Sequence, residues 1–154
     1  MRPNMERNLT ILVAEDDENY GIILRKALDE IGRPNPVHIL QDGEEVIRYL
    51  EGTGKYADRS VFQFPAVMLL DLKMPRNGGF EVLEWLRSHP ECPVVPVLVL
   101  SSSDVEKDVE KAYRLGAHGY LAKPARYEDL KAMLNDTYRF WSWCVKPRVP
   151  KMGG

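Results

Sequence analysis

The sequence predicts an α/β protein with a single doubly wound parallel sheet, (βα)5. Two observations predict this class. Short apolar runs alternate along the chain with segments in which apolar residues recur at helical spacing. Several of these runs carry apolar residues at successive positions, as expected of strands that helices cover on both faces. A chain of 154 residues is long enough for one such domain with its own core.

Five apolar runs are interpreted as the strands. They are "LTILVA" (9–14), "VHIL" (37–40), "PAVMLL" (65–70), "VPVLVL" (95–100) and "GYLA" (119–122). The first and third runs lead directly into acids, and the fourth leads into three serines. Because the carboxyl ends of parallel strands meet at one edge of a sheet, these polar residues are expected to lie close together.

Helices are expected after each strand. The first helix has apolar residues at Tyr20, Ile23, Leu24, Ala27, Leu28 and Ile31, and the last at Leu130, Met133, Leu134, Tyr138 and Trp141. Asp42, three residues before Glu45, predicts a capping-box-like start for the second helix. The third helix is expected at about 79–88, and "EGTGKYADRSVFQF" (51–64) is a long connection before the third strand. Asp104 is expected to cap the fourth helix, and Gly116 to end it in the left-handed conformation.

Composition excludes several classes of protein. The formal charge is -2, so no basic field for nucleic acid is visible. No stretch approaches the ~18 consecutive apolar residues of a membrane span, and "MRPNMERNLT" is not a signal peptide, which predicts a cytoplasmic protein. Cys92 and Cys144 lack metal or redox spacing. The expected organisation is a tail at 1–8, one domain at 9–142 and a tail at 143–154, without an output domain.

The polar residues at the strand ends predict a metal and phosphate site. They are Glu15, Asp16 and Asp17 after the first strand, Asp71 after the third, Ser101 after the fourth, and Lys123 and Pro124 after the fifth. Clustered carboxylates repel one another unless a cation joins them, and oxygen ligands suit Mg²⁺. A lysine and a serine hydroxyl can hold the outer oxygens of a metal-bound anion. This set of groups suits phosphoryl transfer by positioning and charge neutralisation.

Four segments together resemble the receiver domain of two-component response regulators. They are "ILVAEDDEN", "VMLLDLKMPRNGGFEVL", "VPVLVLSSSD" and "GAHGYLAKP", in that family's order and spacing. The resemblance covers about residues 9–139. It implies a flavodoxin-like receiver fold with strand order 2-1-3-4-5. It also implies a phosphorelay function, in which an aspartate takes a phosphoryl group from the phosphohistidine of a sensor histidine kinase.

The resemblance assigns the acceptor and metal residues. Asp71 matches the phosphoacceptor, and Asp16 matches the acid that binds Mg²⁺ directly. Glu15 matches the neighbouring acid, which usually acts through a metal-bound water. Lys73 matches the residue whose backbone carbonyl binds the metal, and its side chain is expected at the entrance of the site. The domain would assist its own phosphorylation and dephosphorylation, without being a turnover enzyme.

The resemblance also assigns the residues that respond to phosphorylation. Ser101 matches the hydroxyl that moves onto the phosphoryl oxygen, Lys123 the basic residue that pairs with that oxygen, and Tyr120 the aromatic switch. Pro124 matches the residue after a cis peptide bond. Ala125 departs from the family, which often has a large apolar or aromatic residue there. This departure alters the expected docking face for a downstream protein target or phosphotransfer protein.

Three questions stay open at this point. The long loop and the lack of a second domain resemble stand-alone regulators that accompany bacterial phytochromes, which makes such a kinase a candidate partner. A Mg²⁺-dependent phosphatase with an aspartyl nucleophile and an interaction module that works without phosphorylation are alternative functions. The phosphatase is disfavoured because Lys73 stands where such enzymes place a second acid. The aromatic cluster Tyr138, Phe140, Trp141 and Trp143 either packs on the sheet or forms a homodimer or partner surface.

Overall fold

The computed structural model describes residues 9–33 and 35–144. Five parallel strands form one sheet in the order β2-β1-β3-β4-β5. The strands are β1 (Thr10–Ala14), β2 (Val37–Leu40), β3 (Pro65–Leu70), β4 (Val97–Ser101) and β5 (Gly119–Ala122). The helices are α1 (Glu18–Glu30), α2 (Gly43–Glu51), α3 (Gly79–Ser88), α4 (Glu106–Arg114) and α5 (Tyr127–Trp143), with a short 3-10 turn η1 (Gly54–Tyr56). The predicted fold class and strand order are confirmed.

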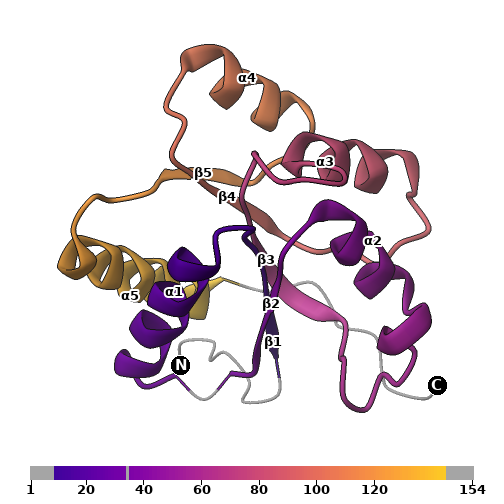
Figure 1. Cartoon of the computed structure of the whole chain (residues 1–154), viewed down its shortest axis with the longest axis horizontal. Helices are drawn as coiled ribbons and strands as arrows, with labels where there is room; N and C mark the ends of the chain where they lie inside the picture. Colours follow the sequence, from indigo (N-terminus) through magenta and orange to yellow (C-terminus); the bar gives the residue numbers. More distant parts are fainter. Residues whose placement is uncertain (1–8, 34, 145–154) are drawn as a thin grey trace.

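Helices cover both faces of the sheet (Figure 1), with α1 and α5 side by side on one face and α2, α3 and α4 on the other. Alternate residues of β1 supply the two cores, because successive strand side chains point to opposite faces. Ile11 and Val13 pack with α1 and α5, whereas Leu12 and Ala14 pack with the residues of the opposite layer. Burial on both faces explains why the strands are apolar at successive positions.

Side-chain caps begin the first two helices. Asp17 accepts hydrogen bonds from the backbone N–H groups of Asn19 and Tyr20, at 3.0 and 3.2 Å. The predicted cap of α2 is confirmed, since Asp42 Oδ1 accepts the N–H of Glu45 at 2.8 Å. Glu45 does not complete a reciprocal capping box, because its carboxylate instead accepts the hydroxyl of Tyr56.

The start of α4 differs from the prediction. Its N-cap is Val105, without a side-chain cap, so the capping role predicted for Asp104 is wrong. The first turn is instead tied to the preceding loop by the Ser103 hydroxyl, which donates to the Asp108 carboxylate at 2.8 Å. The predicted end of the helix is confirmed, because Gly116 has a φ of +106°.

The long connection at 51–64 is held against α2 by aromatic side chains. Tyr49, Tyr56 and Phe62 lie with ring centroids 5.1 to 6.0 Å apart. Arg59 closes the connection by donating to the backbone carbonyls of Leu50 and Phe62, at 2.9 and 3.0 Å. The connection is therefore packed against the layer formed by α2.

The aromatic cluster near the C-terminus is partly packed and partly exposed. The Tyr138 hydroxyl donates to Asn35 Oδ1 at 2.6 Å, which ties α5 to the loop before β2. Phe140 and Trp143 are 71% and 59% exposed. Part of the cluster therefore packs and part faces solvent.

The proposed tails, 1–8 and all but the first two residues of 143–154, lie outside the described residues, and α5 itself extends to Trp143. In the part of the chain that the structure describes, no helix has the length and apolar character needed to cross a bilayer.

Candidate functional site

Three carboxylates meet at the carboxyl ends of β1 and β3. These strands are neighbours, and the N–H of Asp71 donates to the carbonyl of Ala14 at 3.0 Å. Glu15, Asp16 and Asp71 can each place an oxygen within 4.8 Å of the others. Glu15 and Asp71 are buried, at 2% and 6% exposure, whereas Asp16 is exposed. The predicted acidic cluster therefore has two buried members and one that opens to solvent.

Lys123 lies against the two buried acids. Its backbone N–H donates to the Ser101 carbonyl at 2.8 Å, which fixes the end of β5 beside β4. Its Nζ lies 2.6 Å from Glu15 Oε1 and 3.1 Å from Asp71 Oδ2. Burial opposes the charge on Lys123, but the hydrogen bond to Glu15 and the charge of Asp71 outweigh it, so its pKa is raised. Burial raises the pKa of Glu15, although Lys123 opposes this effect.

The donor set suits a hard divalent cation. The cluster has three carboxylates, and the Lys123 ammonium contacts two of them, so the cluster has an excess of negative charge, and every ligand it offers is an oxygen. Both oxygens of Glu15 are already engaged, one by Lys123 and the other by the N–H of Asp17 at 3.1 Å. This agrees with an indirect role for Glu15. Asp16 and Asp71 are then the carboxylates best placed to hold a metal directly.

The loop that follows Asp71 returns closely to the acceptor. The N–H of Lys73 lies 3.4 Å from Asp71 Oδ1, and the Lys73 side chain is exposed. Gly79, the first residue of α3, packs so tightly that an added Cβ would lie 2.3 Å from the Asp71 carbonyl oxygen. A side chain at position 79 would displace the backbone that carries the acceptor.

The two predicted switch residues, Ser101 and Tyr120, both contact Ser103. Ser101 is fully buried at the end of β4, and its Oγ accepts the N–H of Ser103 at 3.2 Å. The half-buried Tyr120 donates its hydroxyl to the Ser103 carbonyl at 2.5 Å. The loop between β4 and α4 thus joins the Ser101 hydroxyl to the Tyr120 ring. The switching roles themselves stay predictions.

The prediction of a cis peptide bond before Pro124 is wrong. None of the peptide bonds in the described residues is cis, and the bond from Lys123 to Pro124 is trans. Trans is the favoured form even before proline, by about 0.5–1 kcal/mol. Lys123 reaches both buried carboxylates from this trans backbone.

Tyr20 is a site residue that the sequence analysis assigned only to the apolar face of the first helix. Its ring centroid lies 4.3 Å from Lys123 Nζ, within cation–π range. Its buried hydroxyl has no hydrogen-bond partner among the described residues. Burial raises its pKa, with Lys123 opposing. Its position in the first turn of α1, directly after the acids that follow β1, was the available signal, because that turn borders the site.

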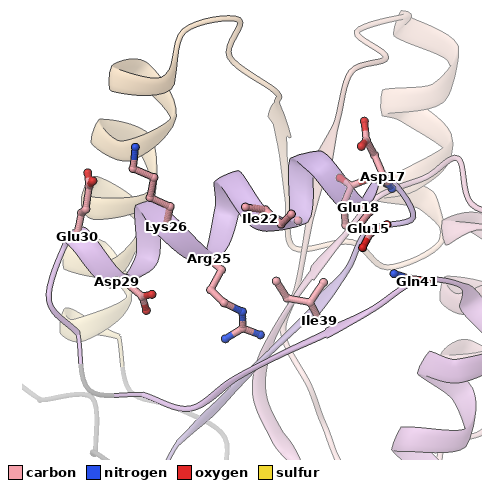
Figure 2. A pocket seen from close by; sticks show the side chains of 11 residues that line it. Glu15, Asp17, Glu18, Ile22, Arg25, Lys26, Asp29, Glu30, Ile39 and Gln41 are labelled. Atoms are coloured by element: carbon pink, nitrogen blue, oxygen red, sulfur yellow. Dashed lines mark hydrogen bonds between the residues drawn. The ribbon is translucent and has the colours of Figure 1, made fainter.

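A groove of about 480 Å³ runs from the acid site along α1 and the exposed edge of β2 (Figure 2). Glu15 and Gln41 lie at one end, Ile22 in the middle and Glu30 at the far end. More acidic than basic side chains line it, which disfavours a small anionic ligand. The groove therefore borders the compact site around Asp71 but is poorly suited to bind an anion itself.

The fold and this site define a receiver domain. Residues 11–135 match the family described as "Response regulator receiver domain", and the chain belongs to that family. It is 31% identical over 131 residues to the response regulator Rcp1 of Synechocystis sp., covering 85% of this chain and 87% of Rcp1.

Two solved structures extend the likeness to response regulators of light signalling. The response regulator RPA3017, described in red light signalling of R. palustris, superimposes with a TM-score of 0.86 at 32% identity, over 92% of this chain and 99% of its own. The phosphorylated cyanobacterial phytochrome response regulator RcpA gives 0.83 at 32% identity, over the same shares. The chain is thus a response regulator receiver domain similar to phytochrome response regulators, with an acidic pocket able to hold a divalent metal.

Proposed function

We propose that Asp71 accepts a phosphoryl group from the phosphohistidine of a sensor histidine kinase. The observation that carries this proposal is the arrangement of Asp71 beside Glu15, Asp16 and Lys123 at the end of β3. In the reaction, the bond from phosphorus to the histidine nitrogen breaks and a bond from phosphorus to an Asp71 oxygen forms. Asp71 Oδ2 is held by Lys123 at 3.1 Å, whereas in the described part of the chain Oδ1 has only the 3.4 Å contact to Lys73 N–H. We assign the attack to Oδ1.

Mg²⁺ is the metal we assign to the site. Asp16, Asp71 and the Lys73 carbonyl would hold it, with Glu15 acting through a bound water. When bound, the ion supplies positive charge that offsets the charge on the transferring phosphoryl group. The chain's own contribution is to keep Asp71 in place through its N–H bond to Ala14, and to hold the Lys123 ammonium where the phosphoryl oxygens arrive.

Phosphorylation would be read out as protein binding. A new anion on Asp71 attracts Lys123 and the Ser101 hydroxyl, and Ser101 is bonded to the loop that also holds Tyr120. Moving Ser101 would therefore shift Tyr120 and bias the surface formed by α4, β5 and α5. We propose a downstream protein or phosphotransfer protein as the partner of that surface. The exposed Phe140 and Trp143 at the end of α5 make a homodimer a second candidate occupant.

We propose a bacterial phytochrome as the kinase, on the strength of the likeness to RPA3017 and RcpA. Receiver domains are typically signalling modules without an activity of their own on external substrates. This chain would accordingly act once per phosphoryl group, in the cytoplasm, and assist only its own phosphorylation and dephosphorylation.

The test uses a small acyl or amido phosphate as donor, with and without Mg²⁺, and the mass of the intact protein as readout. We expect one added phosphoryl group on the wild type with Mg²⁺ and none on Asp71→Asn, with both proteins giving the same circular dichroism. Asp104→Asn is the matched control, since Asp104 is an exposed acid outside the site. A wild type that shows no adduct, once rapid hydrolysis has been excluded by time points, contradicts the proposal.

The same assay separates the alternatives. A phosphatase would turn over small phosphate esters repeatedly, and an interaction module would neither turn over nor become labelled. A receiver is labelled once per chain. No observation in the site favours the phosphatase, because exposed Lys73 occupies the position where such an enzyme needs an acid.

A further inference from the structure

One buried carboxylate joins the start of α2 to the loop that follows the acceptor. The Asp42 side chain is 3% exposed, although its partner Arg76 is 70% exposed. Asp42 Oδ2 accepts two hydrogen bonds from the Arg76 guanidinium, from Nε at 3.1 Å and Nη2 at 2.8 Å. Its other oxygen caps α2 through the N–H of Glu45. The same carboxylate therefore fixes a helix start and a loop that lies 34 residues later in the sequence.

Backbone contacts reinforce this junction. The N–H of Glu44 donates to the carbonyl of Arg76 at 2.8 Å. Gly43 lies so close to the loop that an added Cβ would be 1.9 Å from the carbonyl oxygen of Asn77. Arg76 and Asn77 both have positive φ, at 45° and 69°, a conformation that residues with a side chain rarely adopt. Such a strained pair persists only where the surroundings hold it in place.

The far end of the loop is attached to the acceptor itself. The N–H of Gly79 donates to the carbonyl of Leu72 at 2.9 Å, and Gly79 packs on the Asp71 carbonyl. Residues 72–78 thus form a short bridge whose two ends lie next to the Asp71 backbone and whose middle is held by Asp42 through Arg76. Lys73, whose N–H faces Asp71 Oδ1, lies inside this bridge. A shift at Arg76 would be transmitted to Lys73 over a few residues of backbone.

We propose that Asp42 and Arg76 are positioning residues for phosphoryl transfer, which act by holding the loop 72–78 so that the Lys73 backbone faces the metal and Asp71. This inference rests on the proposed function, because it concerns the metal ligand assigned to Lys73. Within residues 9–33 and 35–144, the Asp71 carboxylate bonds to the Lys73 N–H and to Lys123 and to neither Asp42 nor Arg76, so the effect passes through the loop. Loss of the pair releases the strain at Arg76 and Asn77 and lets the Lys73 carbonyl move from its place.

The experiment measures Mg²⁺ binding by calorimetry and, separately, the rate of labelling by a small phosphate donor across Mg²⁺ concentrations. Arg76→Ala is expected to weaken Mg²⁺ binding by about 10-fold, as for other residues that orient metal ligands. The maximal labelling rate at saturating Mg²⁺ should change much less than the Mg²⁺ concentration needed to reach half of it. Asp42→Asn should have a similar effect while preserving the helix cap, since Asn is as good a cap as Asp.

Two further variants keep the test specific. Arg76→Lys keeps the charge but not the paired hydrogen bonds of the guanidinium, so it should fall between the wild type and Arg76→Ala. The double variant Asp42→Asn/Arg76→Ala should bind Mg²⁺ about as weakly as either single variant, because the two residues act as one unit. Arg48→Ala is the matched control. Arg48 forms an exposed ion pair with Glu44 on the same helix, and its removal should leave Mg²⁺ binding within about twofold of the wild type.

The outcomes separate this inference from the proposed function. Weakened Mg²⁺ binding in both single variants, without further loss in the double, supports the inference. The inference alone is overturned if the wild type is labelled on Asp71 with Mg²⁺ but the Arg76 variants bind Mg²⁺ as tightly as Arg48→Ala does. This holds even if the melting temperature of the Arg76 variants falls. The inference is also overturned if the loss of Mg²⁺ affinity in the double variant equals the product of the losses in the two single variants. A wild type that neither binds Mg²⁺ nor becomes labelled overturns the proposed function and this inference with it.

Discussion

The ammonium group of Lys123 lies 3.1 Å from the carboxylate of Asp71, although 52 residues separate them in the chain. The same ammonium is 2.6 Å from Glu15, so a single cation bridges two buried acids. Without a metal, Lys123 is the principal counter-charge inside the site. The stability of the metal-free protein therefore depends on a residue that the proposed function also requires.

Replacing Lys123 by methionine should destabilise the metal-free protein by about 3 kcal/mol, because it leaves buried carboxylates without their partner. Burial already raises the pKa of Glu15, and loss of Lys123 raises it further. An acid with a raised folded-state pKa destabilises the fold when ionised and ceases to do so as the pH falls through that pKa. The deficit should thus be larger at pH 8 than at pH 5, as measured by urea unfolding.

Lys131→Met is the control for this prediction. Lys131 bonds Glu30 at 3.2 Å on the surface of α1 and α5, where both side chains are about one-third exposed. Its loss should lower the unfolding free energy by less than about 1 kcal/mol, with little dependence on pH. Equal losses in the two variants would show that Lys123 contributes only as an ordinary surface ion pair.

Tyr20 should stabilise the site through its ring and not through its hydroxyl. Its ring centroid is 4.3 Å from Lys123 Nζ, and its buried hydroxyl has no partner among the described residues. Tyr20→Leu should cost about 1 kcal/mol through the lost cation–π contact. Tyr20→Phe keeps the ring and removes a polar group without a bond, so chemical unfolding should show unchanged or increased stability. A Phe variant as unstable as the Leu variant would contradict this account.

Two glycines at helices should respond in opposite directions to alanine. Gly21 in α1 has room for a methyl group, since an added Cβ would meet Ile39 at 3.6 Å. Gly21→Ala should therefore stabilise the protein by about 0.5–1 kcal/mol through helix propensity. Gly43→Ala should destabilise it by about 1–3 kcal/mol, because the methyl group collides with the Asn77 carbonyl. Thermal unfolding of both variants checks the pair, and a stabilised Gly43→Ala would show that the loop moves easily.

His38 should make stability fall as the pH decreases below about 6.5. Burial, with the charge of Arg25, lowers the pKa of His38 in the folded protein. Below the unfolded value near 6.5, the unfolded chain gains a proton that the folded chain does not, so stability falls as the pH decreases. The loss ends once the pH is below the folded pKa. His38→Gln should flatten this part of the urea-unfolding profile, and an unchanged slope would assign the dependence to other groups.

Much of the site was predictable because its members stand at strand ends. The run "VMLLD" places Asp71 at the end of a buried strand, and the acids after "LTILVA" must lie at the same edge of a parallel sheet. The prediction for Asp104 failed because a capping residue type is only a local preference, and the loop before α4 is instead held by the bond from Ser103 to Asp108. The cis bond before Pro124 came from resemblance, and the trans bond is the one observed.

The sequence by itself determined the alternation of strands and helices, the parallel sheet and the edge at which the acids lie. These features follow from hydrophobic periodicity and from apolar runs, which depend only on residues that are close together in the chain. Only the tertiary structure decided that Lys123 reaches both Glu15 and Asp71, that Tyr20 lies beneath that ammonium, and that Arg76 is paired with Asp42. These contacts join residues far apart in the chain through sheet register and strained loop backbone. Arg76 adopts positive φ although arginine rarely does, so its residue type did not predict the backbone conformation that brings the loop to α2.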